Sequence, residues 1–195
     1  EEANIKLSQD LEKAGVHVVY GVVDLKTHAK VSLVVRREGK KLNTYVHFGT
    51  GNYHPTTARI YTDLSLFTCN IDYTSDASRF FNMVTGHNDT DNWSLIEAAP
   101  KGLRKKLLKL IDEEIINAKS GKPSGIWLKC NAIVDPIIIN ALYKASSSGV
   151  KIDLIVRGVC CLKPGVPNLS ENIKVKSIIG RFLEHGRIYC FAAGR

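Results

Sequence analysis

Apolar residues recur at helical spacing at the start of the chain and then gather in short runs. The spacing over residues 4–14 predicts an amphipathic helix, and Gly15 is expected to end it. Valine-rich runs then predict strands over residues 16–23 and 31–36. A third strand is expected over residues 42–48, and a short polar turn joins it to the second in a hairpin.

The middle of the chain is rich in Asp, Ser, Asn and Gly, which are typical of turns and loops. Within residues 71–100 we expect only a short helix around residues 75–84, and Ala98-Ala99-Pro100 closes the stretch. We interpret this stretch as a boundary between two halves of the chain.

Helical spacing returns beyond this boundary. Apolar positions predict an amphipathic helix over residues 103–118, with lysines early and Asp112-Glu113-Glu114 later. This charge order opposes the helix dipole, so tertiary packing or ligand contacts must outweigh it. Glycine and proline then separate the helix from a strand expected over residues 126–129.

The second half repeats the organisation of the first. Residues 143–152 resemble residues 11–18, since both show a helix end, a Gly-Val step and the start of a strand. Each copy leads on to a histidine that is followed two positions later by a basic residue. We therefore expect two lobes that each supply one histidine to a common site. The two pairs are His28 with Lys30 and His185 with Arg187.

The composition is that of an ordinary globular chain of 195 residues, 44% hydrophobic and 24% charged. No run of about eighteen apolar residues could span a bilayer, and no leader opens the chain, so a cytoplasmic location is expected. The formal net charge of +8 predicts an anionic partner, such as nucleic acid, an acidic lipid surface or polyphosphate. Aromatic residues do not interleave with basic ones as in RNA-binding sequences, which disfavours nucleic acid.

The five cysteines predict neither a disulfide framework nor a zinc knuckle, because no C-x-x-C pair or matching histidine spacing occurs. We expect reduced and mostly buried thiols, with Cys160-Cys161 buried beside the strand that precedes them. The acidic residues show no metal-ligand pattern, so no residue is assigned to a metal.

The segment around His28 carries the clearest candidate chemistry. Lys26 and Lys30 flank the histidine, and the turn Gly49-Thr50-Gly51-Asn52 follows about twenty residues later. An imidazole nitrogen can accept a phosphoryl group, lysines can neutralise its oxygens, and backbone N–H groups at glycines can cradle the remainder. A surface histidine in a basic turn is the alternative.

Four long blocks of the chain resemble the bacterial polyphosphate kinase family, whose catalytic half is phospholipase D-like. The paired His-x-Lys and His-x-Arg motifs are similar to the duplicated His-x-Lys arrangement of that superfamily. The resemblance covers essentially all 195 residues and implies an α/β, phospholipase D-like fold of two duplicated units, each with a mixed central sheet flanked by helices. The blocks are residues 20–30 (YGVVDLKTHAK), 47–63 (HFGTGNYHPTTARIYTD), 153–165 (DLIVRGVCCLKPG) and 177–189 (SIIGRFLEHGRIY).

The same resemblance implies that the chain is a fragment of the C-terminal catalytic region. Residues 1–97 are then the C-terminal part of a first catalytic unit, and residues 98–195 the N-terminal part of a second. The superfamily aspartate, five positions beyond the lysine, is replaced by Val35 and Ala192. Polyphosphate kinases are expected to lack that aspartate, whereas ordinary phosphodiesterase chemistry requires it.

The reaction that the resemblance implies is reversible transfer of the ATP γ-phosphate to inorganic polyphosphate through a phosphohistidine. His28 matches the residue that is phosphorylated. Lys26 and Lys30, by physical argument alone, would offset charge on the phosphoryl oxygens. Mg²⁺ is expected with ATP, held mainly by phosphate and water.

Three further residues match nucleotide positions of the family. His185 is expected to contact the nucleotide phosphates and to donate a proton to the leaving group, while Tyr61 faces the adenine or ribose. Arg157 is expected to grip phosphate oxygens with its guanidinium fork. The structural alternatives are a packing histidine, a half-buried core tyrosine and a salt bridge at a strand end.

Additional phosphate contacts are predicted on weaker grounds at Arg59 and Arg181. Asn52 and His54 lie in the glycine loop and are candidates to orient His28 or the ligand, although Asn often only satisfies a turn.

Two rival functions remain open from the sequence. A basic module that binds polyanions without catalysis explains the charge but not the paired histidines, and a phospholipase D-like phosphodiesterase needs the missing aspartates. For the kinase, the expected partners are ATP or ADP and polyphosphate, with no nucleic acid. The resemblance also implies a homo-oligomer and allows peripheral association with the inner membrane face.

Overall fold

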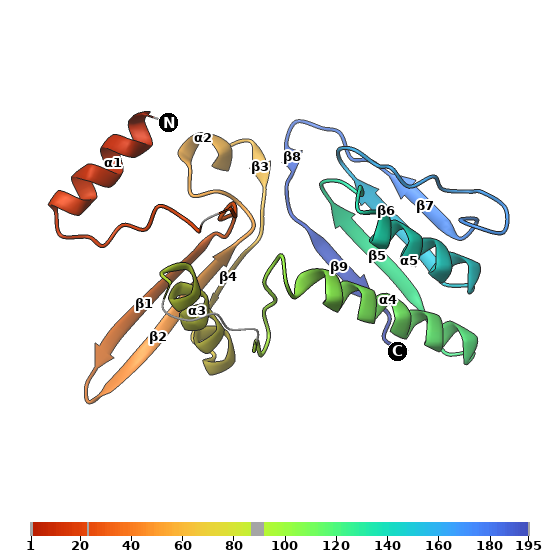
Figure 1. Cartoon of the computed structure of the whole chain (residues 1–195), viewed down its shortest axis with the longest axis horizontal. Helices are drawn as coiled ribbons and strands as arrows, with labels where there is room; N and C mark the ends of the chain where they lie inside the picture. Colours follow the sequence, from red (N-terminus) through yellow and green to blue (C-terminus); the bar gives the residue numbers. More distant parts are fainter. Residues whose placement is uncertain (1, 23, 87–91, 195) are drawn as a thin grey trace.

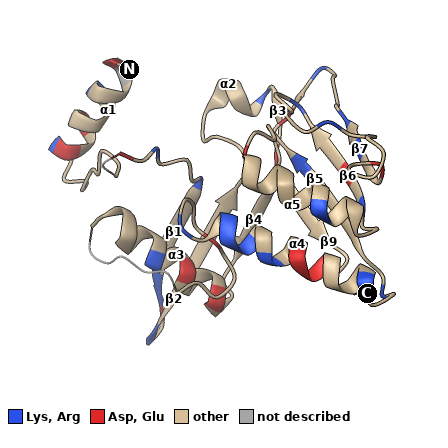
Figure 2. Cartoon of the chain, turned by 45° about the vertical axis from the view of Figure 1, so that its right-hand side comes forward, with Lys and Arg blue, Asp and Glu red and all other residues tan. Residues whose placement is uncertain are grey.

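The computed structural model describes residues 2–22, 24–86 and 92–194. Two α/β lobes lie side by side, and the helix α1 (Glu2–Lys13) stands apart from the sheet of the first lobe (Figures 1 and 2). Gly15, with φ +85°, follows the end of α1, as the sequence predicts. No helix of the described chain is long and apolar enough to cross a membrane.

The first lobe is built on the predicted hairpin. Its antiparallel sheet has the strand order β1-β2-β4, with Val31 opposite Phe48 at the start of the hairpin. The helix α3 packs on β1 and β2, and the Asn70 side chain accepts a hydrogen bond from Asp72 N–H at its start. The elements are β1 (Val31–Glu38), β2 (Lys41–Gly49), β4 (Ser65–Thr68) and α3 (Ile71–Val84).

The strand expected over residues 16–23 is wrong where the structure describes them. Apart from one bridge between Val22 and Leu25, the run pairs with no described strand, and its last position lies outside the described residues. Gly21 and Asp24 have φ +109° and +61°, which interrupt extended backbone. β1 pairs with β2 alone in the described sheet, so no neighbour holds the run as a strand.

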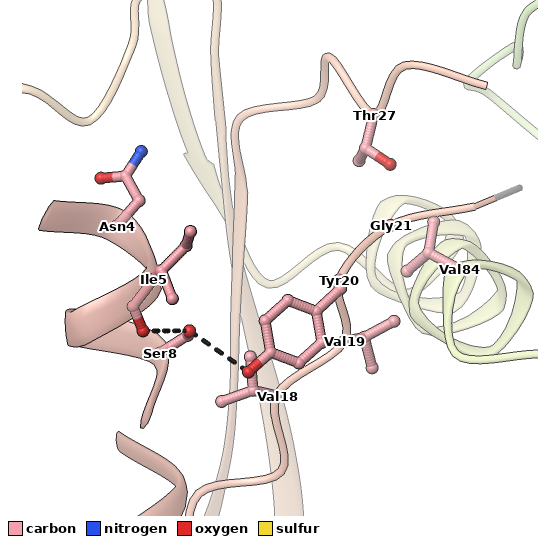
Figure 3. A pocket seen from close by; sticks show the side chains of 9 residues that line it. All are labelled: Asn4, Ile5, Ser8, Val18, Val19, Tyr20, Gly21, Thr27 and Val84. Atoms are coloured by element: carbon pink, nitrogen blue, oxygen red, sulfur yellow. Dashed lines mark hydrogen bonds between the residues drawn. The ribbon is translucent and has the colours of Figure 1, made fainter. Parts of the chain in front are cut away.

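This run lies against α1 instead. The Tyr20 hydroxyl donates to Glu12 Oε1 at 3.0 Å and lies 3.2 Å from Ser8 Oγ. Between α1, residues 18–21 and Val84 the packing leaves a cavity of about 430 Å³ (Figure 3). Tyr20 remains 71% exposed, so the contact covers little of the apolar surface of the run.

The second lobe carries a four-stranded sheet with the order β7-β6-β5-β9. β7, β6 and β5 are parallel, and β9 is antiparallel to β5. The helices α4 and α5 pack against each other and against the sheet (Figure 1), and α4 is the helix that the spacing over residues 103–118 predicts. The elements are α4 (Leu103–Lys119), β5 (Gly125–Cys130), α5 (Pro136–Ser147), β6 (Lys151–Val156), β7 (Ile173–Lys176) and β9 (Ile188–Phe191).

Most of the buried apolar side chains of the described chain belong to the second lobe. One cluster joins the strands to the helices through residues such as Ile126, Leu154 and Leu142, all at most 1% exposed. Among the apolar side chains that the structure describes in the first lobe, only Val46 and Ala77 are buried. The second lobe therefore contains the principal hydrophobic core.

A short parallel pairing joins the lobes. β3 (Tyr61–Thr62) follows the one-turn helix α2 (Pro55–Ala58) in the first lobe, and it pairs with β8 (Leu183–Glu184) of the second. Leu183 N–H donates to the Ile60 carbonyl at 2.8 Å, and His185 N–H donates to the Thr62 carbonyl at 3.3 Å. This join places the residues after β8 beside those of β3.

The expectation of mostly buried cysteines is wrong. Cys130 is buried and Cys160 half-buried, whereas the other three are exposed, and all five are free thiols. Successive side chains of an extended segment point to opposite sides, so Cys161 faces outward when Cys160 faces the strand. The exposed thiols are Cys69, Cys161 and Cys190.

Candidate active site

Two histidines, one from each lobe, approach each other near the join. His28 lies in the connection before β1, and His185 directly follows β8. The charge of His185 lowers the pKa of His28, and that of Lys30 lowers the pKa of His185, so the two segments lie within electrostatic reach. The structure therefore brings the two sequence motifs into one site.

His28 is held in its neutral form. Partial desolvation is the main cause that lowers its pKa, followed by the positive charges of Lys30, Arg187 and Lys26. The Lys30 ammonium lies 3.0 Å from Nε2 of His28. Because an ammonium group can only donate, Nε2 accepts this hydrogen bond and carries a lone pair. The ring therefore presents a nucleophilic nitrogen beside a cation.

His185 is buried, with 6% of its surface exposed. Its ring stacks on that of Tyr61, with centroids 4.5 Å apart and planes inclined by 19°. Burial is the main cause that lowers its pKa, followed by the charges of Arg187 and Arg157, while the nearby backbone of Thr50 acts in the opposite direction. Nδ1 of His185 is buried without a hydrogen-bond partner in the described chain, which leaves a polar atom available to a ligand.

Cations surround the histidine pair. Lys26, Lys30 and Arg187 all act on His28, and Arg157 and Arg187 act on His185. Arg157 forms no salt bridge with the described residues. The alternative role expected for it, a salt bridge at a strand end, is therefore not seen among them. Such an excess of positive charge favours an anionic ligand.

Sequence reasoning placed Arg187 in the paired motif but not among the site residues. The structure gives it a central position, because its charge lowers the pKa values of His28, Lys30 and His185. The signal was present, since Arg187 follows His185 by the same two positions that separate Lys30 from His28.

The glycine turn does not provide the expected cradle at its first two positions. Gly49 N–H donates to the Lys30 carbonyl at 2.8 Å, and Thr50 N–H donates to the Leu64 carbonyl at 3.0 Å. A side chain at Gly51 would collide with the carboxylate of Asp63. The N–H groups of Gly49 and Thr50 are thus used within the fold. Gly51 has no side chain, which leaves room for the Asp63 carboxylate.

The other predicted site residues form no hydrogen bond or ring contact with either histidine in the described chain. His54 caps α2 by accepting a hydrogen bond from Thr57 N–H at 3.4 Å, and the Arg181 guanidinium lies 5.5 Å from the centre of the Phe182 ring. The side chains of Asn52 and Arg59 form no hydrogen bond or ion pair with the described residues. A phosphate contact at these positions stays a prediction.

The site does not fit a resident metal ion. Within residues 2–22, 24–86 and 92–194, no three His, Cys, Asp or Glu side chains gather to hold one. The groups that act on His28 are cations, which repel a metal ion.

Two α/β lobes that each supply a histidine to one strongly basic site define an α/β protein built around a histidine pair. Residues 1–90 match the model of polyphosphate kinase C-terminal domain 1, and residues 96–195 match that of polyphosphate kinase C-terminal domain 2. The chain belongs to the polyphosphate kinase family.

Individual relatives agree with this assignment. The chain is 55% identical to a polyphosphate kinase of Erythrobacter litoralis and 50% identical to one of Streptomyces coelicolor, in both cases over 100% of its length. It covers only 27% and 26% of those relatives. The crystal structure of polyphosphate kinase from Porphyromonas gingivalis aligns with the whole chain at a TM-score of 0.88 and 40% identity, over 32% of that structure. The chain thus spans about a quarter of the length of the curated relatives it matches.

Proposed function

We propose that this chain carries the phosphohistidine chemistry of an ATP:polyphosphate phosphotransferase, which moves the ATP γ-phosphate reversibly to the end of a polyphosphate chain. The observation that carries this proposal is the neutral His28 ring with Lys30 at its Nε2, facing a second histidine in a basic site. The family assignment supports it.

In the first half-reaction, the Nε2 lone pair of His28 attacks the γ-phosphorus. A P–N bond forms, the bond from the γ-phosphorus to the bridging oxygen breaks, and ADP leaves. Lys30 shifts from Nε2 to the phosphoryl oxygens, and Lys26 and Arg187 offset their charge. In the second half-reaction, the terminal oxygen of polyphosphate attacks the phosphohistidine, the P–N bond breaks and neutral His28 is restored.

The nucleotide occupies the side of the site formed by His185, Tyr61 and Arg157. The unpartnered Nδ1 of His185 supports a hydrogen bond to the nucleotide phosphates. Because burial and neighbouring cations lower the pKa of His185, it can supply a proton to the departing ADP only after the negative charge of the bound nucleotide raises that pKa. The Tyr61 ring, already stacked on His185, offers an aromatic face to the adenine or ribose. Arg157 grips phosphate oxygens from the end of β6.

We further propose a phospholipase D-like architecture, with residues 1–97 and 98–195 as parts of two duplicated units. The α/β content of both lobes and the paired motifs support this arrangement. The expectation of a mixed sheet in each unit is wrong for the described first lobe, because its strands β1, β2 and β4 pair only antiparallel, and it also lacks the strand expected before His28. Mg²⁺ arrives with ATP on phosphate oxygens and water. The complete enzyme is proposed to be a cytoplasmic homo-oligomer that can associate with the inner membrane face.

Two observations weigh against the rival functions. Val35 and Ala192 stand where a phospholipase D-like phosphodiesterase needs aspartate. A binding module without catalysis needs cations but no neutral histidine hydrogen-bonded to a lysine.

Phosphoryl labelling distinguishes the three functions. The longest natural form of the protein is incubated with γ-labelled ATP and magnesium, and acid-labile, base-stable label is followed together with polyphosphate formation. Label and product should both disappear in His28→Ala. The control is His17→Ala, an exposed histidine outside the site, which should retain both.

Undiminished labelling of His28→Ala would remove His28 from its role. A folded wild-type protein that neither takes up label nor forms polyphosphate would favour the binding module, and diester hydrolysis without label would favour the phosphodiesterase.

A further inference from the structure

A second basic surface lies beside the start of α4, apart from the histidine pair. A cavity of about 310 Å³ opens there, with the half-buried Trp93 and the exposed Glu97 in its wall. Figure 2 shows the basic residues gathered on the first half of α4 and the acidic ones on the second. We call this the lysine cavity, after the four lysines that line it: Lys101, Lys105, Lys106 and Lys109.

Tertiary contacts account for much of the unusual charge order of α4. Buried Glu114 accepts hydrogen bonds from the backbone N–H groups of Gly125 and Ala193, at 2.8 and 2.6 Å. The acidic half of the helix is therefore held in place by the fold, although it opposes the helix dipole.

Several of the other charged side chains of α4 form ion pairs. Arg104 lies 2.9 Å from Asp135, and Lys109 lies 3.8 Å from Glu113. Lys105 and Lys106 have no ion pair in the part of the chain that the structure describes. These two exposed ammonium groups are the charges that the fold itself leaves uncompensated.

Their position is electrostatically unfavourable without a ligand. The first turn of α4 contains no acidic residue, and no side chain caps the helix, so like charges meet the positive end of the dipole. Glu97 packs so closely on Gly102 that a side chain there would collide with its carboxylate. Glu97 is the one acidic residue that lines the cavity, and Lys105 and Lys106 stay without an ion pair among the described residues.

We infer that the lysine cavity binds a linear polyphosphate chain, at a site separate from the histidine pair. The inference rests on the proposed function, which makes polyphosphate the substrate. Lys105 and Lys109 are one helical turn apart, about 6 Å along the axis, so a chain with a charge on every unit can contact both at once. A single phosphate has too few charges to match the whole cavity.

Such a site holds the polymer near the enzyme between transfers. Binding a distant part of the chain raises the effective concentration of its end at the histidine pair. Long chains should therefore be used more efficiently than tripolyphosphate, which has fewer units with which to contact a second site.

Trp93 provides a local probe of the cavity. Trp93 and Trp127 are the two tryptophans of the sequence, so Trp127→Phe leaves Trp93 as the sole tryptophan of the 195-residue chain. Titration with long-chain polyphosphate should change the fluorescence of Trp93. An unchanged Trp93 signal at saturating polyphosphate would overturn the inference.

A matched pair of double variants tests the lysines. Lys105→Gln with Lys106→Gln should weaken polyphosphate binding about tenfold. It should also lower the slope of log affinity against log salt by about 1.4, because two charge contacts are lost. Lys40→Gln with Lys41→Gln removes the same charge from the hairpin turn and should change affinity less than about twofold. Equal weakening in both variants would overturn the inference.

Two further comparisons separate this site from the proposed function. His28 should still accept label from ATP in Lys105→Gln with Lys106→Gln, since the cavity takes no part in that step. If label fails in wild type but Trp93 still reports binding that depends on Lys105 and Lys106, only the proposed function fails. If a single-stranded oligonucleotide of equal charge binds as tightly as polyphosphate, the assignment of the ligand is overturned.

Discussion

At the scale of single residues, the contact between Lys30 and His28 sets the charge state of the site. The positive charge of Lys30 lowers the pKa of His28 because it disfavours the imidazolium form, and the Lys30 ammonium donates a hydrogen bond to the Nε2 lone pair. The pKa of Lys30 is itself lowered by desolvation and by Arg187. A partly desolvated lysine is well placed to exchange a ring nitrogen for a phosphoryl oxygen.

Lys30→Met should therefore raise the pKa of His28 toward its ordinary value, because both the positive charge and the donor to Nε2 are removed. The measurement is a titration of the His28 ring signals by NMR. Lys13→Met, which breaks only an exposed ion pair with Asp10, is the control and should leave the His28 titration unchanged. A His28 pKa that stays fixed or falls in Lys30→Met would contradict the assigned contact.

At the scale of elements, an ion pair stabilises the pairing of β3 with β8, and its acidic member, Glu184, immediately precedes His185. Lys129 in β5 lies 2.5 Å from Glu184 in β8, with side chains only 18% and 25% exposed. The pKa of Glu184 is lowered mainly by its hydrogen bond with Lys129, and then by that with Thr62 of β3. Glu184 thus connects the sheet of the second lobe to the strand that carries Tyr61.

Lys129→Met should lower the free energy of unfolding by more than Lys144→Met does, since it leaves the Glu184 carboxylate, only 25% exposed, without its charged partner. Urea unfolding measures the change. Lys144→Met breaks the exposed pair with Asp112 and should cost less than about 1 kcal/mol. Adding Glu184→Gln to Lys129→Met should restore part of the loss. Equal effects of the Lys129 and Lys144 substitutions would mean that the Lys129 pair does not secure the join.

At the scale of the whole molecule, the two lobes differ in how much apolar surface they bury. The extensive core of the second lobe includes residues such as Ile152, whereas the described first lobe buries few apolar side chains, Val46 among them. Because protection against local opening depends on buried contacts, the lobes should not be equally stable.

Native-state hydrogen exchange should therefore show slower exchange for the amides of β5 and β6 than for those of β1 and β2, by at least about tenfold. The helix α1, which lies apart from the sheet, should exchange fastest and serves as an internal reference. Uniform protection across both sheets would show that the first lobe is stabilised by contacts other than its core.

Local patterns predicted much of this fold because many elements depend on neighbours in sequence. The hairpin of β1 and β2 and the helix α4 follow from alternation and helical spacing. The prediction of a strand over residues 16–23 was wrong because a strand needs a hydrogen-bonded partner, and no strand lies beside this run in the described chain. The pairing of β3 with β8 joins short segments about 120 residues apart, as in the hydrogen bond from Thr62 Oγ1 to the Leu183 carbonyl, and no local pattern shows it.

The candidate site was predictable to the extent that its motifs are paired. Equal spacing identified His28 with Lys30 and His185 with Arg187. The stacking of Tyr61 on His185 depends on the join and could not be read from spacing. The N–H groups of the glycine turn were misassigned because residue type alone does not show which backbone donors the fold already uses.

The join between the lobes also has a consequence for assembly. Tyr61 and His185 lie on the two sides of the same short pairing, and His28 comes from one lobe only. Neither lobe by itself can display the complete constellation, so the proposed phosphoryl transfer would require both lobes in their docked arrangement. A chain whose two halves have not yet come together would then be unable to hydrolyse or transfer phosphate wastefully through this site.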